Sequence, residues 1–257
     1  MKNRLAVALL ALAATSVAGC GGSDSGSKAT GKTETGTLNV LAASSLTESF
    51  TELKKQFESD HPGVTVKLAF DSSATLAEQV DQGAPADVLA TADAATMQTV
   101  VDAGNASTPT DFATNKLAMV VPADNPAHLS SFADLGKPGV AYVACVPTAP
   151  CGKLARTQLD AHHVTAKPKS EEVDVKAVLA KVEAGEADAG LVYVTDAVAA
   201  GTKVTSIDVP ASGDTLNVYP IAVLKNAVKP TLAQEWVDLV LSSQGRQVLT
   251  TAGFGTP

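Results

Sequence analysis

Short apolar runs alternate along the chain with segments in which apolar residues recur every three or four positions. The short runs predict buried strands at 38–42, 64–70, 88–91, 116–121, 140–144, 189–194 and 221–224. The helical spacing predicts helices at 46–59, 75–82, 94–103, 152–162, 175–184 and 232–249. Strands that alternate with helices predict an α/β fold with largely parallel sheets. In such sheets ligands bind at the carboxyl ends of the strands.

The first 20 residues have the pattern of a secretory signal peptide. Lys2 and Arg4 precede an apolar run over 5–14, and the segment ends in Val17-Ala18-Gly19-Cys20. The apolar run is too short to cross a bilayer as a stable helix. The last four residues resemble the lipobox of bacterial lipoproteins, which implies that residues 1–19 are removed and that Cys20 is lipidated. The alternative is an ordinary signal peptide in which Cys20 is an incidental thiol.

The segment after the predicted cleavage site has the composition of a flexible linker. Residues 21–36 contain no apolar residue larger than Ala, so they cannot form a packed core. We therefore expect Cys20 and a linker over 20–36 to tether the protein to the cell membrane, outside the cytoplasm. About 220 residues follow, which is enough for one large domain or for two lobes of ~100 residues each.

The chain is acidic. It carries 19 basic and 27 acidic residues, a net charge of −8, and loss of the signal peptide removes Lys2 and Arg4 and lowers the net charge to −10. An acidic chain without a cluster of Lys and Arg argues against binding to nucleic acid or to an anionic membrane surface. Aromatic residues are few, so the core is expected to consist mainly of Ala, Val and Leu.

Two cysteines remain besides Cys20. Cys145 and Cys151 are close in sequence, and in an oxidising compartment such a pair predicts a disulfide. Closing so short a loop adds roughly 2 kcal/mol in the chain-entropy model. Two free thiols are the alternative. A zinc site is less favoured, because the neighbouring His162 and His163 lack the spacing of metal ligands.

Four predicted helix starts carry residues suited to binding an anion. They are Ser45-Leu46-Thr47-Glu48, which has the pattern of a capping box, then Ser72-Ser73, Pro150-Cys151-Gly152 and Asp174-Val175. Helix starts offer unpaired backbone N–H groups and the positive end of the helix dipole. Every α/β protein has such turns, so simple capping, above all by Ser45 and Asp174, is the alternative.

Longer motifs around these helix starts resemble the molybdate-binding proteins of bacterial ABC importers. The resemblance covers nearly all of the chain after the linker. It rests on Val40-Leu41-Ala42-Ala43-Ser44-Ser45-Leu46-Thr47, Phe70-Asp71-Ser72-Ser73-Ala74-Thr75-Leu76-Ala77, Gly83-Ala84-Pro85-Ala86-Asp87-Val88, Glu172-Val173-Asp174-Val175, Gly190-Leu191-Val192-Tyr193-Val194-Thr195-Asp196-Ala197 and the chain end from Gln244 through Ala252-Gly253-Phe254. The motif at 83–87 is the most specific, and we interpret it as a helix stop and a turn into a strand.

The resemblance implies a two-lobe periplasmic-binding-protein fold of type II, with the ligand in the cleft between the lobes. Lobe I would comprise residues 37–119 and 222–257, and lobe II residues 120–221. The implied function is capture of molybdate, and also of tungstate, and delivery to the permease of an ABC transporter. The protein would be a monomer that needs no cofactor, catalyses no reaction and contacts the membrane through its lipid anchor only.

In that family, hydrogen bonds hold the oxyanion without a cationic side chain. Carried over by motif, Ser45 and Ser73 would each offer a backbone N–H and a hydroxyl, Cys151 and Val175 a backbone N–H each, and Tyr193 its phenol. The oxyanion's oxygens only accept hydrogen bonds, so a pocket of donors satisfies them, and no buried Lys or Arg needs desolvating. Molybdenum would be bound as the oxyanion, so no site for a bare metal cation is expected. Without the resemblance, Tyr193 is interpreted as a core tyrosine beside a strand.

The chain departs from the family pattern at two positions. Cys151 replaces a small residue before the glycine, but only its N–H is needed there, and a bridge to Cys145 could stiffen the loop. Asp71 stands where a small neutral residue is expected, and inside the pocket it would repel a dianion. Because neighbouring residues of a strand alternate, with Phe70 pointing inward, we expect Asp71 to face solvent.

Two other functions remain open. A binding protein for sulfate, phosphate or an organic anion would use the same fold. A secreted serine hydrolase using Ser45 or Ser73 is much less favoured, because no His or Asp stands in a recognisable triad context. The chain also lacks the Gly-x-Ser-x-Gly and HExxH motifs.

Overall fold

The structure is a computed structural model that describes residues 34–210 and 216–257. The predicted signal peptide, Cys20 and most of the predicted linker lie outside the described residues. The described residues belong to one compact unit. None of their helices combines the length and the apolar character that a membrane span requires.

Strands and helices alternate as predicted, and the α/β class is confirmed. The strands are β1 (Gly36–Ala43), β2 (Val64–Asp71), β3 (Val88–Ala90), β4 (Thr110–Pro122), β5 (Tyr142–Cys145), β6 (Ser170–Glu172), β7 (Ala189–Tyr193), β8 (Val204–Asp208) and β9 (Leu216–Val223). The α-helices are α1 (Thr47–Asp60), α2 (Ser73–Asp81), α3 (Ala94–Asp102), α4 (Pro150–Ala161), α5 (Val175–Glu183), α6 (Val194–Ala200), α7 (Pro230–Leu241) and α8 (Ser243–Thr251). Three short 3₁₀ turns complete the described part: η1 (Ser44–Leu46), η2 (Phe132–Gly136) and η3 (Gly201–Lys203).

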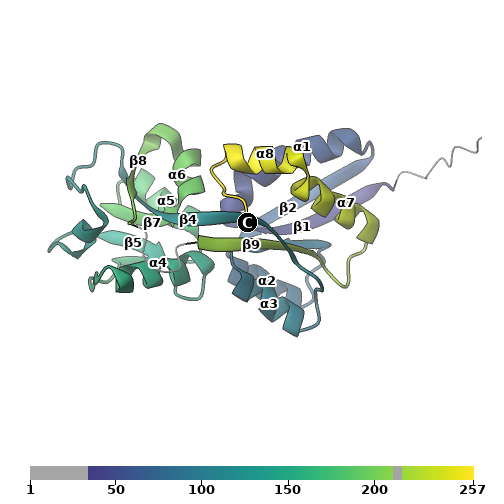
Figure 1. Cartoon of the computed structure of the whole chain (residues 1–257), viewed down its shortest axis with the longest axis horizontal. Coiled ribbons are helices and arrows are strands. Elements are labelled where there is room, and N and C mark those ends of the chain that lie inside the picture. The colour runs from purple at the N-terminus through teal and green to yellow at the C-terminus, as the bar shows by residue number, and fades with distance from the viewer. Residues whose placement is uncertain (1–33, 211–215) are drawn as a thin grey trace, which may run out of the picture. The chain divides into compact units, whose positions relative to one another are not determined.

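The strands follow one another in the order β2-β1-β3-β9-β4-β7-β5-β6, with β8 also paired to β4. β1 pairs in parallel with β2 and β3, and β5 pairs in parallel with β6 and β7. The long strands β4 and β9 are antiparallel to each other and to their other partners. Figure 1 shows β4 and β9 passing from the group around β1 and β2, the first lobe, to the group around β5 and β7, the second lobe.

Helices cover both faces of the sheet in the first lobe. Because neighbouring residues of a strand point to opposite faces, β1 contributes to two cores. Val40 packs in the large core with α1, whereas Leu41 packs with residues of α2 and α3. In Figure 1, α1, α7 and α8 lie on one side of these strands and α2 and α3 on the other.

Aromatic residues gather on one face of the first lobe, although the chain has few of them. The ring of Trp236 in α7 meets Phe50 and Phe57 of α1 edge-on, with ring centroids 5.6 and 5.5 Å apart. Phe50 also contacts Phe112 of β4 at 6.0 Å. The predicted core of Ala, Val and Leu is therefore supplemented here by an aromatic cluster that ties α1 and α7 to the long strand.

One predicted helix is wrong. The segment expected as a single helix over 232–249 forms α7 and α8, which are separated at Ser242. The Ser242 hydroxyl accepts the N–H of Gly245 at 3.0 Å and so caps α8. A Cβ on Gly245 would lie 2.3 Å from the carbonyl oxygens of Leu239 and Val240, so this tight turn needs glycine. The apolar spacing continues across the break, which is why the pattern did not reveal it.

Several elements were not predicted. β6 is a polar edge strand, β8 is mostly exposed, and α6 begins directly after β7. β9 begins at Leu216, earlier than the expected strand at 221–224, and contains Pro220. These segments lack the apolar run or the helical spacing on which the predictions depend.

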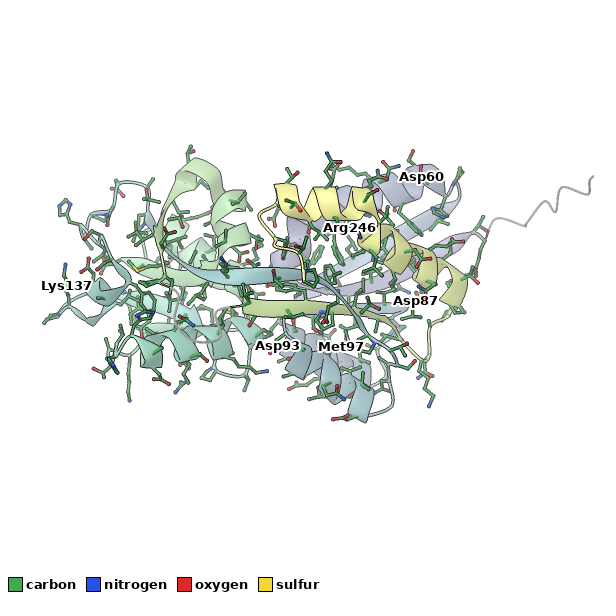
Figure 2. The ribbon with its side chains drawn as sticks, viewed as in Figure 1. Asp60, Asp87, Asp93, Met97, Lys137 and Arg246 are labelled. Atoms are coloured by element: carbon green, nitrogen blue, oxygen red, sulfur yellow. A yellow bond between two sulfur atoms is a disulfide. The ribbon has the colours of Figure 1, made fainter. Side chains whose placement is uncertain are left out.

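Asp87 anchors the motif at 83–87 inside the first lobe. This carboxylate is buried and is labelled in Figure 2. Its Oδ2 accepts the N–H of Asn39 in β1 at 2.8 Å, and its Oδ1 accepts the N–H groups of Val228 and Lys229 at 2.7 and 3.1 Å. The motif therefore joins the start of β3 to β1 and to the turn before α7.

We expect Asp87→Ala to lower the free energy of unfolding by about 3 kcal/mol or more, because three N–H groups would lose their acceptor. Urea unfolding of the purified protein measures the effect. Asp102→Ala is the matched control, since the Asp102 carboxylate accepts a hydrogen bond from Gln98 on an exposed helix surface, and this substitution should cost less than about 0.5 kcal/mol. Equal losses in both variants would contradict the structural role of Asp87.

Candidate functional site

The candidate site lies where strands end and helices begin. In the first lobe, η1 follows β1 and α2 follows β2; in the second lobe, α4 follows β5, α5 follows β6 and α6 follows β7. The carboxyl ends of parallel strands meet at the same edge of a sheet, so the residues at these junctions come together.

One small cavity collects residues from all these junctions. It is lined by Ala43, Ser44, Ser45, Asp71, Ser72, Ser73, Ala92, Pro150, Cys151, Asp174, Val175 and Tyr193. The space open to the centre of a water molecule is about 10 Å³, room for about one water-sized group. In this arrangement the cavity is too small for an amino acid or a sugar. The structure brings Ser45, Ser73, Cys151, Val175 and Tyr193 together around it, and all five are buried.

Three of the lining residues carry hydroxyl groups that also contact other protein groups. The Ser73 oxygen accepts the N–H of Ala92 at 2.9 Å, which leaves the Ser73 hydroxyl proton for another acceptor. The Tyr193 oxygen accepts a side-chain N–H of Asn217 at 2.7 Å. The Ser45 hydroxyl lies 2.9 Å from the hydroxyl of Tyr219, and either of the two can be the donor.

Helix starts supply the backbone donors. Ser73 and Val175 are the first residues of α2 and α5, and Cys151 is the second residue of α4. The first N–H groups of a helix have no partner within it, and the helix dipole adds positive potential there. Asp174 caps α5 as predicted, with its side chain accepting the N–H of Ala177 at 2.9 Å.

A disulfide closes the turn before α4. Cys145, the last residue of β5, is bonded to Cys151, and their Cα atoms lie 5.8 Å apart. The next residue, Gly152, packs so closely that a Cβ there would lie 2.0 Å from the carbonyl oxygen of Val146. The position of the Cys151 amide is therefore set by both the covalent bond and close backbone packing.

The charged groups at the cavity are two carboxylates, and no Lys or Arg belongs to its lining. The expectation that Asp71 faces solvent is wrong, because Asp71 is partly buried and lines the cavity. It is the last residue of its strand, and its Oδ1 accepts the N–H of Ser72 at 2.6 Å, so the strand alternation no longer applies. Asp71 and Asp174 therefore both accept hydrogen bonds from backbone N–H groups beside them.

Ion pairs lie just outside the cavity and connect elements of the two lobes. Lys153 of α4 lies 3.0 Å from Asp93, which caps α3 and is labelled in Figure 2. Lys176 of α5 lies 2.8 Å from Glu48 of α1. Lys153 lies two positions after Cys151, and Lys176 lies one position after Val175. Both lysines are therefore close to expected anion-binding residues, but neither lines the cavity.

The comparisons with known proteins assign this arrangement to a family. A family profile described as bacterial extracellular solute-binding protein matches residues 38–255. The chain belongs to the bacterial extracellular solute-binding protein family. It is 45% identical over 240 residues, 93% of this chain and 92% of the relative, to the molybdate-binding protein ModA of Mycobacterium tuberculosis (strain ATCC 25618 / H37Rv). It is 32% identical to the molybdate-binding protein ModA of Escherichia coli (strain K12), over 85% of this chain and 89% of the relative.

Solved structures of solute-binding proteins share the fold. The Azotobacter vinelandii periplasmic molybdate-binding protein matches with a TM-score of 0.74 at 20% identity, over 86% of this chain and 99% of that chain. The sulfate-binding protein SubI of Mycobacterium tuberculosis H37Rv also matches with a TM-score of 0.74, at 18% identity and over 86% of both chains. At these identities the matches bear on the fold alone, and they confirm the predicted two-lobe α/β fold.

The expected capping role of Ser45 is wrong in this solute-binding protein. Ser45 lies within η1, Leu46 is the residue before α1, and neither makes a side-chain cap. Glu48, the other half of the expected capping box, instead binds Lys176. The Ser45 hydroxyl forms a hydrogen bond with the Tyr219 hydroxyl. Removing the Ser45 hydroxyl would therefore break a contact between two segments that are distant in sequence and would leave the helix start unchanged.

Four polar residues extend the site beyond the five carried over by motif: Ser72, whose helix start the sequence indicated, and Asn115, Asn217 and Tyr219, which were not identified from the sequence. The Ser72 hydroxyl is buried, lines the cavity and has no hydrogen-bond partner among the described residues. The other three form hydrogen bonds with cavity residues or with one another. Asn217 interrupts the largely apolar strand β9, which is a signal that could have drawn attention to it, whereas Asn115 stands between Thr114 and Lys116 and carries no such signal.

The phenols at the site remain protonated at neutral pH. Burial raises the pKa of Tyr193 well above its ordinary value, and burial also raises the pKa of Tyr219. Both hydroxyls are therefore available as hydrogen-bond donors in the solute-binding protein.

Asp196 is a fully buried carboxyl group next to the site. Its Oδ2 accepts the N–H of Tyr193 at 3.1 Å, and its Oδ1 lies 3.2 Å from Nζ of Lys176 without hydrogen-bond geometry. Burial raises the pKa of Asp196 to about 6, although Lys176 and the Tyr193 N–H lower it. Burial lowers the pKa of Lys176, but the neighbouring carboxylates of Asp196 and Glu48 raise it by more. The pKa of Lys176 therefore lies above its ordinary value.

This raised pKa predicts that acidification stabilises the protein relative to Asp196→Asn. The Asp196 carboxyl has a pKa of about 6 in the folded protein and an ordinary value of 3.8. The folded state therefore takes up a proton that the unfolded state does not, and this contribution to stability is lost as the pH rises through 6. From pH 7 to pH 5 we expect the wild type to gain about 1 kcal/mol relative to the variant.

Urea unfolding at the two pH values measures this difference. Asp102→Asn is the control, because it removes one carboxylate from an exposed position. If the free energies of unfolding of wild type and Asp196→Asn changed in parallel with pH, the raised pKa of Asp196 would be refuted.

Proposed function

We propose that the protein captures molybdate outside the cytoplasm and delivers it to the membrane permease of an ABC importer. The observation that carries this proposal is the convergence of five neutral hydrogen-bond donor residues, Ser45, Ser73, Cys151, Val175 and Tyr193, on one small cavity without a lining cation. Such a cavity suits a small oxyanion, whose oxygens only accept hydrogen bonds. The 45% identity to a relative named molybdate-binding protein supports molybdate as that anion.

Donors come from both lobes, which is what a binding protein that closes around its ligand requires. Ser45 and Ser73 follow β1 and β2, whereas Cys151 and Val175 follow β5 and β6 and Tyr193 is the last residue of β7. We assign residues 37–119 and 222–257 to lobe I and residues 120–221 to lobe II. Tungstate has the same shape and charge as molybdate and is proposed as a second ligand. A lipid on Cys20 would anchor the protein, which we propose to act as a monomer.

Calorimetric titration of the purified protein tests the ligand. We expect molybdate and tungstate to bind, and sulfate and phosphate to bind at least about tenfold more weakly, because a smaller anion would leave buried N–H groups unpaired at ~1–3 kcal/mol each. Equal affinities for molybdate and sulfate would overturn the proposed specificity. Hydrolysis of chromogenic esters that depended on Ser45 or Ser73 would instead support a serine hydrolase.

Tyr193→Phe tests whether the second lobe contributes a donor to the anion. We expect the affinity for molybdate to fall about 10- to 100-fold, because a hydrogen bond to a charged acceptor is lost. Tyr142→Phe is a matched control: Tyr142 is equally buried in the second lobe, but its hydroxyl donates to the carbonyl of Ala166 at 2.6 Å, away from the cavity.

Paired melting curves and titrations separate the two roles. Tyr142→Phe should lower the melting temperature of the ligand-free protein and leave the affinity unchanged. If Tyr193→Phe behaved in the same way, Tyr193 would be a core residue and its assignment to the anion site would fail.

A further inference from the structure

Two asparagines lie opposite each other on the strands that pass between the lobes. Asn115 of β4 and Asn217 of β9 are register partners in the antiparallel pair. Each donates a side-chain N–H to a tyrosine at the site: Asn217 to Tyr193 at 2.7 Å and Asn115 to Tyr219 at 3.3 Å. Directly opposite residues of an antiparallel pair lie on the same face of the sheet, so the two amides form one polar pair.

Neighbouring groups fix which end of each amide faces the tyrosines. The Asn115 oxygen accepts the N–H of Lys116 at 3.0 Å, so its nitrogen must point the other way, where it also donates to Thr195 at 2.9 Å. The Asn217 nitrogen lies 3.4 Å from the carbonyl oxygen of Pro150. Turning this amide over would place two oxygens against each other, which is unfavourable.

The orientation of Asn217 determines what the Tyr193 hydroxyl can do. An amide N–H only donates, so the Tyr193 oxygen must accept, and its own proton is free for another acceptor. The neighbouring phenol of Tyr219 packs edge-on with ring centroids 6.1 Å apart, and its oxygen already contacts Asn115 and Ser45. The Tyr193 proton can therefore point toward the Tyr219 oxygen, with which the Tyr193 hydroxyl interacts, or into the cavity that Tyr193 lines, where an anion would be the stronger acceptor.

We propose that Asn217 is a positioning residue for anion binding: it holds the Tyr193 hydroxyl as a donor toward the bound oxyanion. Asn217 also donates to the carbonyl of Pro150, which is the first residue of α4 and precedes Cys151. This contact connects the start of α4 to β9. Asn115 performs the corresponding task on Tyr219, whose hydroxyl meets that of Ser45. The inference rests on the proposed function, because it requires an anion in the cavity.

A double-mutant cycle between Asn217 and Tyr193 tests the proposal. Molybdate affinity is measured by calorimetry for the wild type, Asn217→Ala, Tyr193→Phe and the double variant. We expect Asn217→Ala to weaken binding about fivefold, because the Tyr193 hydroxyl loses the partner that orients it. In the Tyr193→Phe background the same substitution should change affinity by less than about twofold, since the hydroxyl on which Asn217 acts is absent.

Two further measurements separate positioning from general stability. Melting curves of the ligand-free variants report folding, and Asn217→Ser is interpreted in the same way if Asn217→Ala does not fold. Asn105→Ala is the matched control, because Asn105 donates to Asp81 at 2.7 Å on an exposed surface of the first lobe and should leave the affinity unchanged.

The outcomes distinguish the failure of this inference from that of the proposed function. If the wild type bound no molybdate, both would be overturned. If Tyr193→Phe weakened binding and Asn217→Ala weakened it by the same factor in both backgrounds, Asn217 would act independently of the Tyr193 hydroxyl and only the inference would fail. An Asn217→Ala variant with wild-type affinity would also overturn the inference while the function stood.

Discussion

The antiparallel pairing of β4 with β9 is the contact on which the rest of the structure depends. β4 bonds to β9 as far as Lys116, and from Leu117 onward it bonds to β7 and then also to β8. β9 continues the pairing to β3 on the other side. The parallel strands of both lobes are therefore aligned on one two-stranded ribbon, and the helix starts at their carboxyl ends meet at one place. A slip of one residue between the two strands would place Asn115 and Asn217 on opposite faces of the sheet.

The proposed anion site would bury a charged ligand without a charged partner. A lysine in the lining would have to lose its own hydration before it could compensate an anion. Here the positive potential comes instead from helix starts and polarised hydroxyls, while Lys153 and Lys176 remain outside and join the lobes. The two carboxylates in the lining, Asp71 and Asp174, are each hydrogen-bonded to a backbone N–H. These hydrogen bonds reduce the repulsion between the carboxylates and an anion. They also occupy two backbone N–H groups that would otherwise be unpaired.

The sequence predicts the parts of this protein whose signal is local. Apolar runs located the central strands, and the capping role of Asp174 followed from its place before a helix. The same reasoning failed for Ser45, because a 3₁₀ turn precedes α1, and for the break at Ser242, because apolar spacing continues through it. Polar edge strands such as β6 carry no apolar pattern at all. These errors concern segments where packing with distant residues, rather than local spacing, decides the structure.

The site shows the same limit. The motifs of a known family suggested five residues that the structure brings around one cavity, because those motifs are contiguous in sequence. Tyr219 and Asn115 could not be found in this way. Their contacts join residues 174 positions apart, from Ser45 to Tyr219, and 104 positions apart, from Asn115 to Tyr219. Which hydroxyl a side-chain amide will reach is known only once the two long strands have paired.

The disulfide at the start of α4 has a consequence for the timing of site assembly. It closes a turn of the backbone immediately before the amide of Cys151, so this part of the cavity cannot open into many conformations. The entropy of ordering the turn is lost when the bond forms, and a ligand that arrives later does not have to supply it. The disulfide forms only in an oxidising compartment, so export of the chain to such a compartment also completes this part of the cavity.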